Sequence, residues 1–277
     1  MEFDVEILPR SPILSPYIEY YKIITGTIQG KFKVVPFCNQ EIYFHLRHGN
    51  YCLMSPGRYE IKDPIIHLSG LHEVDQDIYS IITENEKVKS FVIVFKPNGI
   101  QKLFRLSNNE IQKQAINGSD LFKADADIIL EKLFDTSNAI EMKIRIERFL
   151  STFISDGTSD SLMNIIADCI KEHNGIIGVQ KISDRFHITP RTFQRRFKDE
   201  FGLSPKNYMQ LIRVNSAVTR LLSGKYDLLS DLAYYSGYYD QSHFIRDIKR
   251  ICGTLPEIME KNKALIQCHN ISFTDIS

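Results

Sequence analysis

The chain has 277 residues, and its 34 basic and 34 acidic side chains give a formal net charge of zero. Hydrophobic residues make up 43% and charged residues 25%, close to the values of an ordinary globular protein, which excludes a disordered tail, a collagen and a disulfide scaffold. The length favours two domains.

The first part of the chain has the pattern of an antiparallel β fold. Stretches rich in β-branched and aromatic residues, such as 17–25 (YIEYYKIIT) and 41–46 (EIYFHL), are separated by Gly, Pro, Asn and Asp. Further strands are expected at 65–68, 78–83 and 88–95. Short strands at this spacing predict an antiparallel barrel or sandwich.

The pattern becomes helical after residues 97–99 (PNG). Helices are expected at 100–106, 110–114, 120–133 and 139–154. The small polar segment 156–160 (DGTSD) marks a domain boundary. We therefore expect an α+β multidomain protein, with a β-rich domain at 1–155 and an all-α domain at 160–263.

The cysteines and the chain start indicate the compartment. The five cysteines are Cys38, Cys52, Cys169, Cys252 and Cys268, and no C-x-x-C occurs, which excludes a zinc ribbon and a thioredoxin-type site. The acidic N-terminus has no apolar core of a signal peptide, and no apolar run approaches the length of about 18 residues that spans a membrane. A reducing cytoplasm is therefore expected, with no membrane partner.

The zero net charge hides an asymmetry between the two parts. Residues 161–270 hold 16 basic and 11 acidic side chains, a net charge of +5, whereas residues 1–160 hold 18 basic and 22 acidic ones, a net charge of −4. A basic C-terminal half beside an acidic N-terminal half indicates nucleic acid as a partner.

The C-terminal part contains an internal repeat of about 50 residues. Residues 182–205 (ISDRFHITPRTFQRRFKDEFGLSP) match residues 232–256 (LAYYSGYYDQSHFIRDIKRICGTLP). Each copy has the pattern of helix, short turn and helix. We therefore expect helix-turn-helix units at about 178–202 and 228–252, joined by a linker helix at about 205–223.

In the first unit, Thr189 is a suitable N-cap, Pro190 suits the first helical position and Gly202 suits the C-cap. At 100° per residue, three phenylalanines fall on one side of this helix and a polar, basic set falls on the other. The phenylalanines are Phe193, Phe197 and Phe201, and the polar set is Arg191, Gln194, Arg195 and Lys198. Arg and Gln are residue types that read base edges in a major groove.

The second unit follows the same plan. Gly237 suits the turn, and Asp240 suits the N-cap of the next helix. The polar, basic side of that helix holds Ser242, His243, Arg246, Lys249 and Arg250. If the linker helix is rigid, it sets the spacing of the two reading helices, and helices about 34 Å apart enter successive major grooves.

These residues resemble the DNA-binding domain of the AraC/XylS family of transcription regulators over about 165–260. The second unit carries the family signature in Ala233, Gly237, Tyr238, Asp240, Gln241, Ser242, His243, Phe244, Arg246, Lys249, Gly253 and Pro256. The first unit matches at Arg195, Phe197, Lys198 and 202–205 (GLSP). The resemblance implies that the base-reading residues are Arg191, Gln194, Arg195, Ser242, His243 and Arg246. We expect Arg196, Lys198, Lys249 and Arg250 to contact DNA phosphates.

The N-terminal 150 residues are similar to the β-rich domain that precedes this DNA-binding domain in one branch of the family, through EIYFHL, VIVFKPNG and ERFL. We therefore expect a sequence-specific transcription regulator that binds double-stranded DNA, is not an enzyme and uses no cofactor. RNA polymerase, a small-molecule effector and a second copy of the chain are further partners that the sequence leaves open.

Two other classes of function stay open at this point. One is a β-barrel, cupin-like metal enzyme with an accessory helical domain, and the other is a helical module that binds protein. The histidines of the β region are His45, His48, His67 and His72, but they lack cupin-like ligand spacing, so no metal site is expected. Cys38 and Cys52 lie among apolar residues, where thiols are usually inert. An aromatic set either packs the core or lines an effector pocket: Tyr17, Tyr20, Tyr21, Tyr43, Phe44 and Tyr51.

Overall fold

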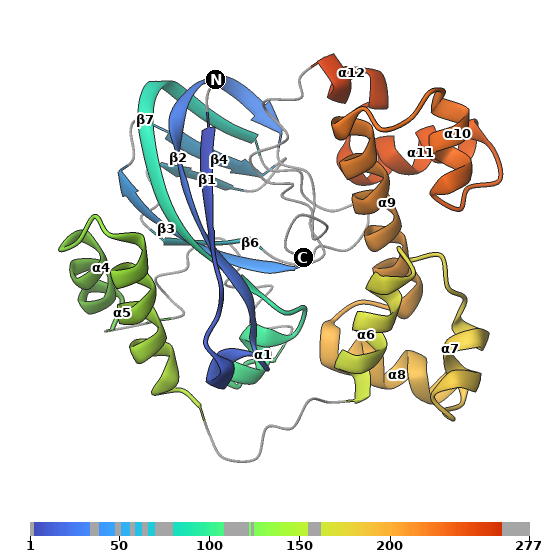
Figure 1. The fold of residues 1–277 in the computed structure, drawn as a ribbon, viewed down its shortest axis with the longest axis horizontal. Coiled ribbons are helices and arrows are strands. Elements are labelled where there is room, and N and C mark those ends of the chain that lie inside the picture. Colours follow the sequence, from blue (N-terminus) through green and yellow to red (C-terminus); the bar gives the residue numbers. More distant parts are fainter. Residues whose placement is uncertain are drawn as a thin grey trace. The chain divides into compact units, whose positions relative to one another are not determined.

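The computed structural model describes residues 3–33, 39–47, 51–55, 59–62, 66–69, 80–107, 122, 125–154 and 162–261. These residues form two units, which divide between residues 154 and 162. The first unit is a β-sheet with helices, and the second is all helical (Figure 1).

The sheet has the strand order β1-β2-β7-β3-β6, and β4 pairs with β5 and with β7. Its strands are β1 (Phe3–Leu8), β2 (Ile18–Lys33), β3 (Gln40–Arg47), β4 (Tyr51–Ser55), β5 (Tyr59–Lys62), β6 (Ile66–Ser69) and β7 (Ser80–Phe95). The registers of β1 with β2, of β3 with β6 and β7, and of β4 with β5 and β7 are all antiparallel. The predicted antiparallel β-rich fold is confirmed.

Several strand limits differ from the sequence prediction. The stretches 78–83 and 88–95 were predicted as two strands, but β7 is continuous from Ser80 to Phe95. It stays extended through its charged middle because β4 pairs with its first part and β3 pairs with its last part. No strand was predicted for β1, β4 or β5, although β1 alternates apolar and acidic residues, which is the pattern of a half-buried strand.

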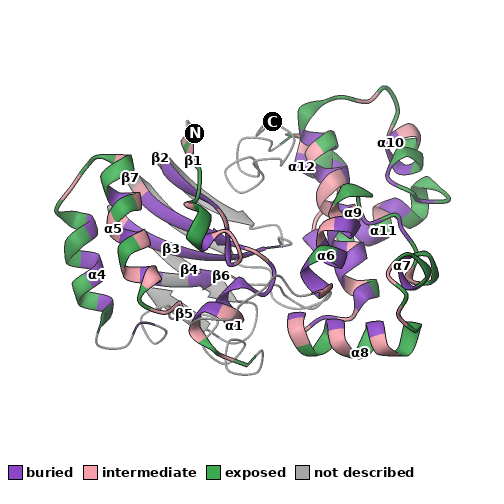
Figure 2. Ribbon diagram, turned by 60° about the horizontal axis from the view of Figure 1, so that its bottom comes forward, coloured by how far each residue is buried: buried purple, intermediate pink, exposed green. Residues whose placement is uncertain are grey.

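One face of the sheet is apolar and packs under helices. The helices of this unit are α1 (Gly99–Phe104), α4 (Asp125–Phe134) and α5 (Ala139–Ser151). Ile129 and Leu133 of α4 and Ile146 of α5 belong to the same core as Phe44 and Phe91 of the sheet. Figure 2 shows α4 and α5 lying over the sheet. The helix predicted at 110–114 lies outside the described residues.

The opposite face of the sheet buries a polar group. Lys22 and Glu41 are 1% and 3% exposed, and the Nζ of Lys22 donates to Oε1 of Glu41 at 2.9 Å. The hydroxyl of Tyr43 donates to the same carboxylate. Close by in the sheet, Nδ1 of His45 lies 2.8 Å from Oγ of Ser90. A buried ion pair is costly to desolvate, so this face is not an ordinary apolar core.

The second unit is built around one long helix. Its helices are α6 (Leu162–Glu172), α7 (Val179–Arg185), α8 (Pro190–Phe201), α9 (Pro205–Ser223), α10 (Leu229–Tyr235), α11 (Gln241–Cys252) and α12 (Pro256–Lys261). The central helix α9 packs against α6, α8, α10, α11 and α12. The predicted pair of helix-turn-helix units joined by a long helix is confirmed. Within the part of the chain that the structure describes, no helix combines the length and apolarity that crossing a membrane requires.

Each of the two helix-turn-helix units has a turn residue with a left-handed backbone. His187 has a φ of 52° and Gly237 has a φ of 75°. In each turn the next N–H returns to the preceding helix, from Ile188 to the carbonyl of Ser183 and from Tyr238 to that of Ala233, both at 3.0 Å. This is the hydrogen bond of a Schellman motif, in which glycine is the favoured residue.

Opposite stability changes are therefore expected at these two positions. Gly237→Ala should destabilise the helical unit, residues 162–261, by about 1–2 kcal/mol because φ is positive at this position. The new Cβ would also lie 2.9 Å from Cγ1 of Ile176. His187→Gly should stabilise the same helical unit by up to about 1 kcal/mol, since it relieves the left-handed strain. Urea unfolding of the two variants and the parent measures both effects. A shift of the same sign in both would contradict the shared turn.

Candidate nucleic-acid interface

The helix α8 is fixed at both ends by its own sequence. The hydroxyl of Thr189 accepts from the backbone N–H of Thr192 at 3.2 Å, and Pro190 occupies the first turn. The helix ends at Gly202, which has a φ of 75°. These ends place Arg191, Gln194 and Arg195 in the first half of the helix.

The rotation of α8 about its axis is fixed by an aromatic cluster. Phe193, Phe197 and Phe201 are all buried. The rings of Phe197 and Phe201 stack with centroids 4.3 Å apart, and Phe197 also lies 5.3 Å from the ring of Tyr208 in α9. Because this side packs inward, the polar side of α8 is directed to solvent (Figure 2).

The polar side of α8 is exposed and basic. Arg191, Gln194, Arg195 and Lys198 are exposed, and Arg196 is intermediate. Arg195 and Arg196 lie 3.7 Å from the carboxylates of Asp199 and Glu200, one turn away on the same helix. Surface pairs of this kind contribute little stability, so they are easily exchanged for phosphate or base contacts.

The helix α11 repeats this arrangement. The carboxylate of Asp240 accepts from the backbone N–H of His243 at 2.7 Å, and the helix ends at Gly253 with a φ of 61°. Phe244 and Ile248 are buried, and the ring of Tyr238 meets Phe244 edge-on at 5.3 Å. The exposed residues of α11 include all five of its predicted DNA-contacting residues: Ser242, His243, Arg246, Lys249 and Arg250.

The connector α9 has 19 residues, which corresponds to a rod of about 28 Å. Its N-cap is Ser204, whose hydroxyl accepts from the N–H of Asn207 at 3.2 Å. Both α8 and α11 pack on this rod. The sequence therefore builds one unit that carries two exposed, basic helix faces.

Comparison with known proteins agrees with this geometry. A family model described as a helix-turn-helix domain matches residues 182–262. The transcriptional activator RhaS of Escherichia fergusonii is 29% identical over 114 residues, which are 40% of this chain and 41% of RhaS. RhaS of Citrobacter koseri is 32% identical over 89 residues, which are 32% of each chain. Residues 182–262 therefore carry a helix-turn-helix domain similar to that of these transcriptional activators, in agreement with the resemblance to the AraC/XylS family.

The matches to these two RhaS proteins span less than half of their length. A second family model, described as a domain of unknown function (DUF6597), matches residues 5–117. Among solved structures, ToxT from Vibrio cholerae aligns over 96% of this chain and 97% of its own, with 14% identity and a TM-score of 0.49. The C-terminal domain of AraT from Geobacillus stearothermophilus aligns over 36% of this chain and 84% of its own, with 22% identity and a TM-score of 0.34.

Of the histidines considered as metal ligands, His45 is the one whose side chain the structure describes. His45 is buried, bonds Ser90 and stacks on the ring of Tyr43 with centroids 5.9 Å apart. His48, His72 and Cys38 lie outside the described residues, as do the side chains of His67, Cys52 and Tyr51.

The aromatic set of the β region is buried wherever its side chains are described. Tyr17, Tyr21 and Phe44 belong to the core under the helices. Tyr20 and Tyr43 lie with Ile24, Val92 and Val94 on the opposite face of the sheet. Core packing accounts for the first group, and the second group surrounds the buried Lys22–Glu41 pair.

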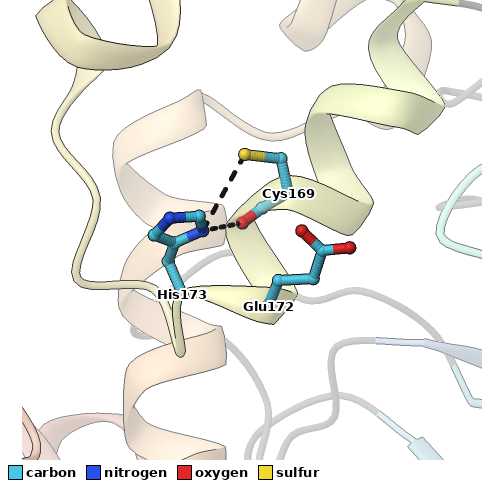
Figure 3. Close-up of side chains that lie close together, drawn as sticks. All are labelled: Cys169, Glu172 and His173. Carbon is cyan, nitrogen blue, oxygen red and sulfur yellow. Dashed lines mark hydrogen bonds between the residues drawn. The ribbon is translucent and has the colours of Figure 1, made fainter.

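One group of metal-ligand types occurs in the described residues, at the end of α6. Ligand atoms of Cys169, Glu172 and His173 lie within 4.8 Å of one another (Figure 3). However, Nδ1 of His173 donates to the carbonyl oxygen of Cys169 at 2.8 Å, so only Nε2 of this ring keeps a lone pair for a metal. Arg185 also donates to Sγ of Cys169 at 3.3 Å, and burial raises the pKa of this thiol. We therefore assign the group to helix-end packing.

The sequence reasoning missed one polar residue of this interface, Asp247. It lies in α11 but is only 7% exposed, at the border between the polar and the apolar side of the helix. Its carboxylate accepts from Nε2 of Gln210 in α9 at 2.7 Å. The sequence did contain a sign of this residue, since Asp247 is an acidic residue among the basic residues of this helix.

Proposed function

We propose that this protein binds specific double-stranded DNA sites and regulates transcription there, with α8 and α11 as its reading helices. The observation that carries the proposal is the pair of exposed faces, each opposite a buried apolar side. Arg191, Gln194 and Arg195 of α8 and Ser242, His243 and Arg246 of α11 are the proposed base-reading residues. Arg binds guanine through a bidentate pair, and Gln binds adenine in the same way.

The remaining cations are proposed to bind the DNA backbone. Arg196, Lys198, Lys249 and Arg250 flank the two reading faces. Cations in such positions neutralise phosphates and release counterions, so the affinity should fall steeply as the salt concentration rises. With α9 between them, the two helices are proposed to enter successive major grooves on one side of the duplex.

The N-terminal unit, residues 1–155, is proposed to sense an effector or to dimerise, and residues 160–263 to form the DNA-binding domain. Two observations support the role of the first unit. The buried Lys22–Glu41 pair offers polar contacts inside the sheet domain. In addition, four large apolar residues of α4 and α5 are exposed, namely Ile128, Phe134, Ile140 and Ile144. Exposed apolar patches of this kind often mark interfaces.

RNA polymerase is proposed as a further partner, since the relatives are transcriptional activators.

Removing a reading arginine should weaken specific binding. Arg195→Ala and Arg246→Ala are each expected to lose about 1–3 kcal/mol of binding free energy on a specific site, because each removes a bidentate base contact. The site is obtained by selecting bound sequences from random DNA with the full chain. Fluorescence anisotropy then measures the affinity of each variant.

Lys225→Ala is the matched control, since this exposed lysine lies in the turn between α9 and α10 and outside both reading helices. It removes the same charge and is expected to change the affinity much less. The groove assignment would be wrong if both arginine variants bound the selected site as tightly as the parent.

A further inference from the structure

The carboxylate of Asp247 joins three side chains at the seam between α11 and α9. Its Oδ2 accepts from Nε2 of Gln210 at 2.7 Å, and its Oδ1 accepts from the guanidinium of Arg250 at 3.3 Å. Nε2 of His243 lies 3.9 Å from Oδ2, one helical turn before it. Gln210 belongs to α9, whereas His243 and Arg250 belong to the exposed side of α11.

A buried carboxylate at this position needs an explanation beyond packing. Desolvation of such a group is costly, and well-packed apolar residues often stabilise a core equally well. Its neighbours toward the core, Phe244 and Ile248, are apolar and buried, so a leucine would extend the same surface. The partners of the carboxylate indicate its purpose, because His243 and Arg250 are proposed DNA contacts.

We propose that Asp247 is a positioning residue for DNA recognition by α11, an inference that rests on the proposed function. Its bond to Gln210 fixes the rotation of α11 relative to the connector α9. Its contacts with Arg250 and His243 hold one phosphate-binding and one base-reading side chain in place. A rotation of α11 would change which side chains face the bases, so this link acts on specificity.

The position of the His243 ring is limited by two neighbours. Its Nε2 faces the carboxylate of Asp247 at 3.9 Å, which is too long for a hydrogen bond and leaves an electrostatic contact. The ring of Tyr238 meets the His243 ring edge-on at 5.2 Å and confines it from another side. Burial, followed by the charge of Asp247, raises the pKa of Tyr238, so its hydroxyl stays neutral.

The test compares Asp247→Asn with the parent, both as full chains, on the selected site and on sites changed one base at a time. Asparagine keeps an oxygen acceptor for Gln210 but loses the charge that faces His243 and Arg250. Discrimination at the base read by His243 is expected to fall about tenfold, and other positions should change little. His243→Ala identifies that base. In the His243→Ala background, Asp247→Asn should cause no further change in the discrimination at that base, because Asp247 acts there through His243.

Asp199→Asn is the matched control. It makes the same chemical change on α8, four residues after Arg195, but its carboxylate is 65% exposed. It is expected to leave discrimination unchanged. The proposal would be overturned if Asp247→Asn left every position unchanged, or if it weakened all positions equally together with a lowered melting temperature.

Failure of the proposed function is a different result, because the parent itself would then select no sequence from random DNA.

Discussion

An alanine in place of Phe197 is expected to lower the free energy of unfolding of α8 by about 3–5 kcal/mol. The Phe197 ring is fully buried between Phe193, Phe201 and Tyr208, at centroid distances of 5.5, 4.3 and 5.3 Å. Its removal leaves a cavity between α8 and α9 that the neighbouring rings fill only in part. Because these rings also fix the rotation of α8, binding to the specific site should weaken as well.

Gln194→Ala separates the loss of stability from the loss of DNA binding. Gln194 is exposed on the same helix, so its truncation should change the unfolding free energy by less than about 0.5 kcal/mol. It should nevertheless reduce the preference for one base of the site. Hydrogen exchange of residues 190–201 in the full chain measures the stability, and anisotropy titration measures the binding. An unchanged exchange rate in Phe197→Ala would show that α8 does not depend on this cluster.

The helical half of the fold was predictable because local signals agree with the tertiary packing. Thr189 and Asp240 cap the two reading helices as their residue types indicate, and Gly202 and Gly253 end them in the left-handed conformation. The phenylalanines of α8 recur at helical spacing and are all buried. Each of these signals lies within a few residues of the feature that it predicts.

The features that escaped prediction depend on contacts between distant parts of the chain. The continuity of β7 follows from its pairing with both β3 and β4, which its charged middle does not reveal. Asp247 is recognisable only with Gln210, which lies in another helix and 37 residues earlier in the chain. The Lys22–Glu41 pair likewise joins two strands, and at the sequence level both residues resemble ordinary solvated charges.

Breaking that buried pair on one side is expected to be strongly destabilising. Lys22→Met should lower the unfolding free energy of the N-terminal unit by about 3–5 kcal/mol, because it leaves the carboxylate of Glu41 buried without its cation. The hydroxyl of Tyr43 would still donate to that carboxylate, but it carries no positive charge. Thermal unfolding, together with hydrogen exchange of β2 and β3, measures the loss.

The double variant Lys22→Met with Glu41→Leu decides why the pair is present. Two apolar side chains of similar volume remove both charges, so stability should return to within about 1 kcal/mol of the parent or exceed it. If stability returns, the protein keeps the pair for a reason other than stability. The double variant should then fold and bind DNA like the parent. If it were as unstable as the single variant, the pair would instead be a structural requirement of the sheet.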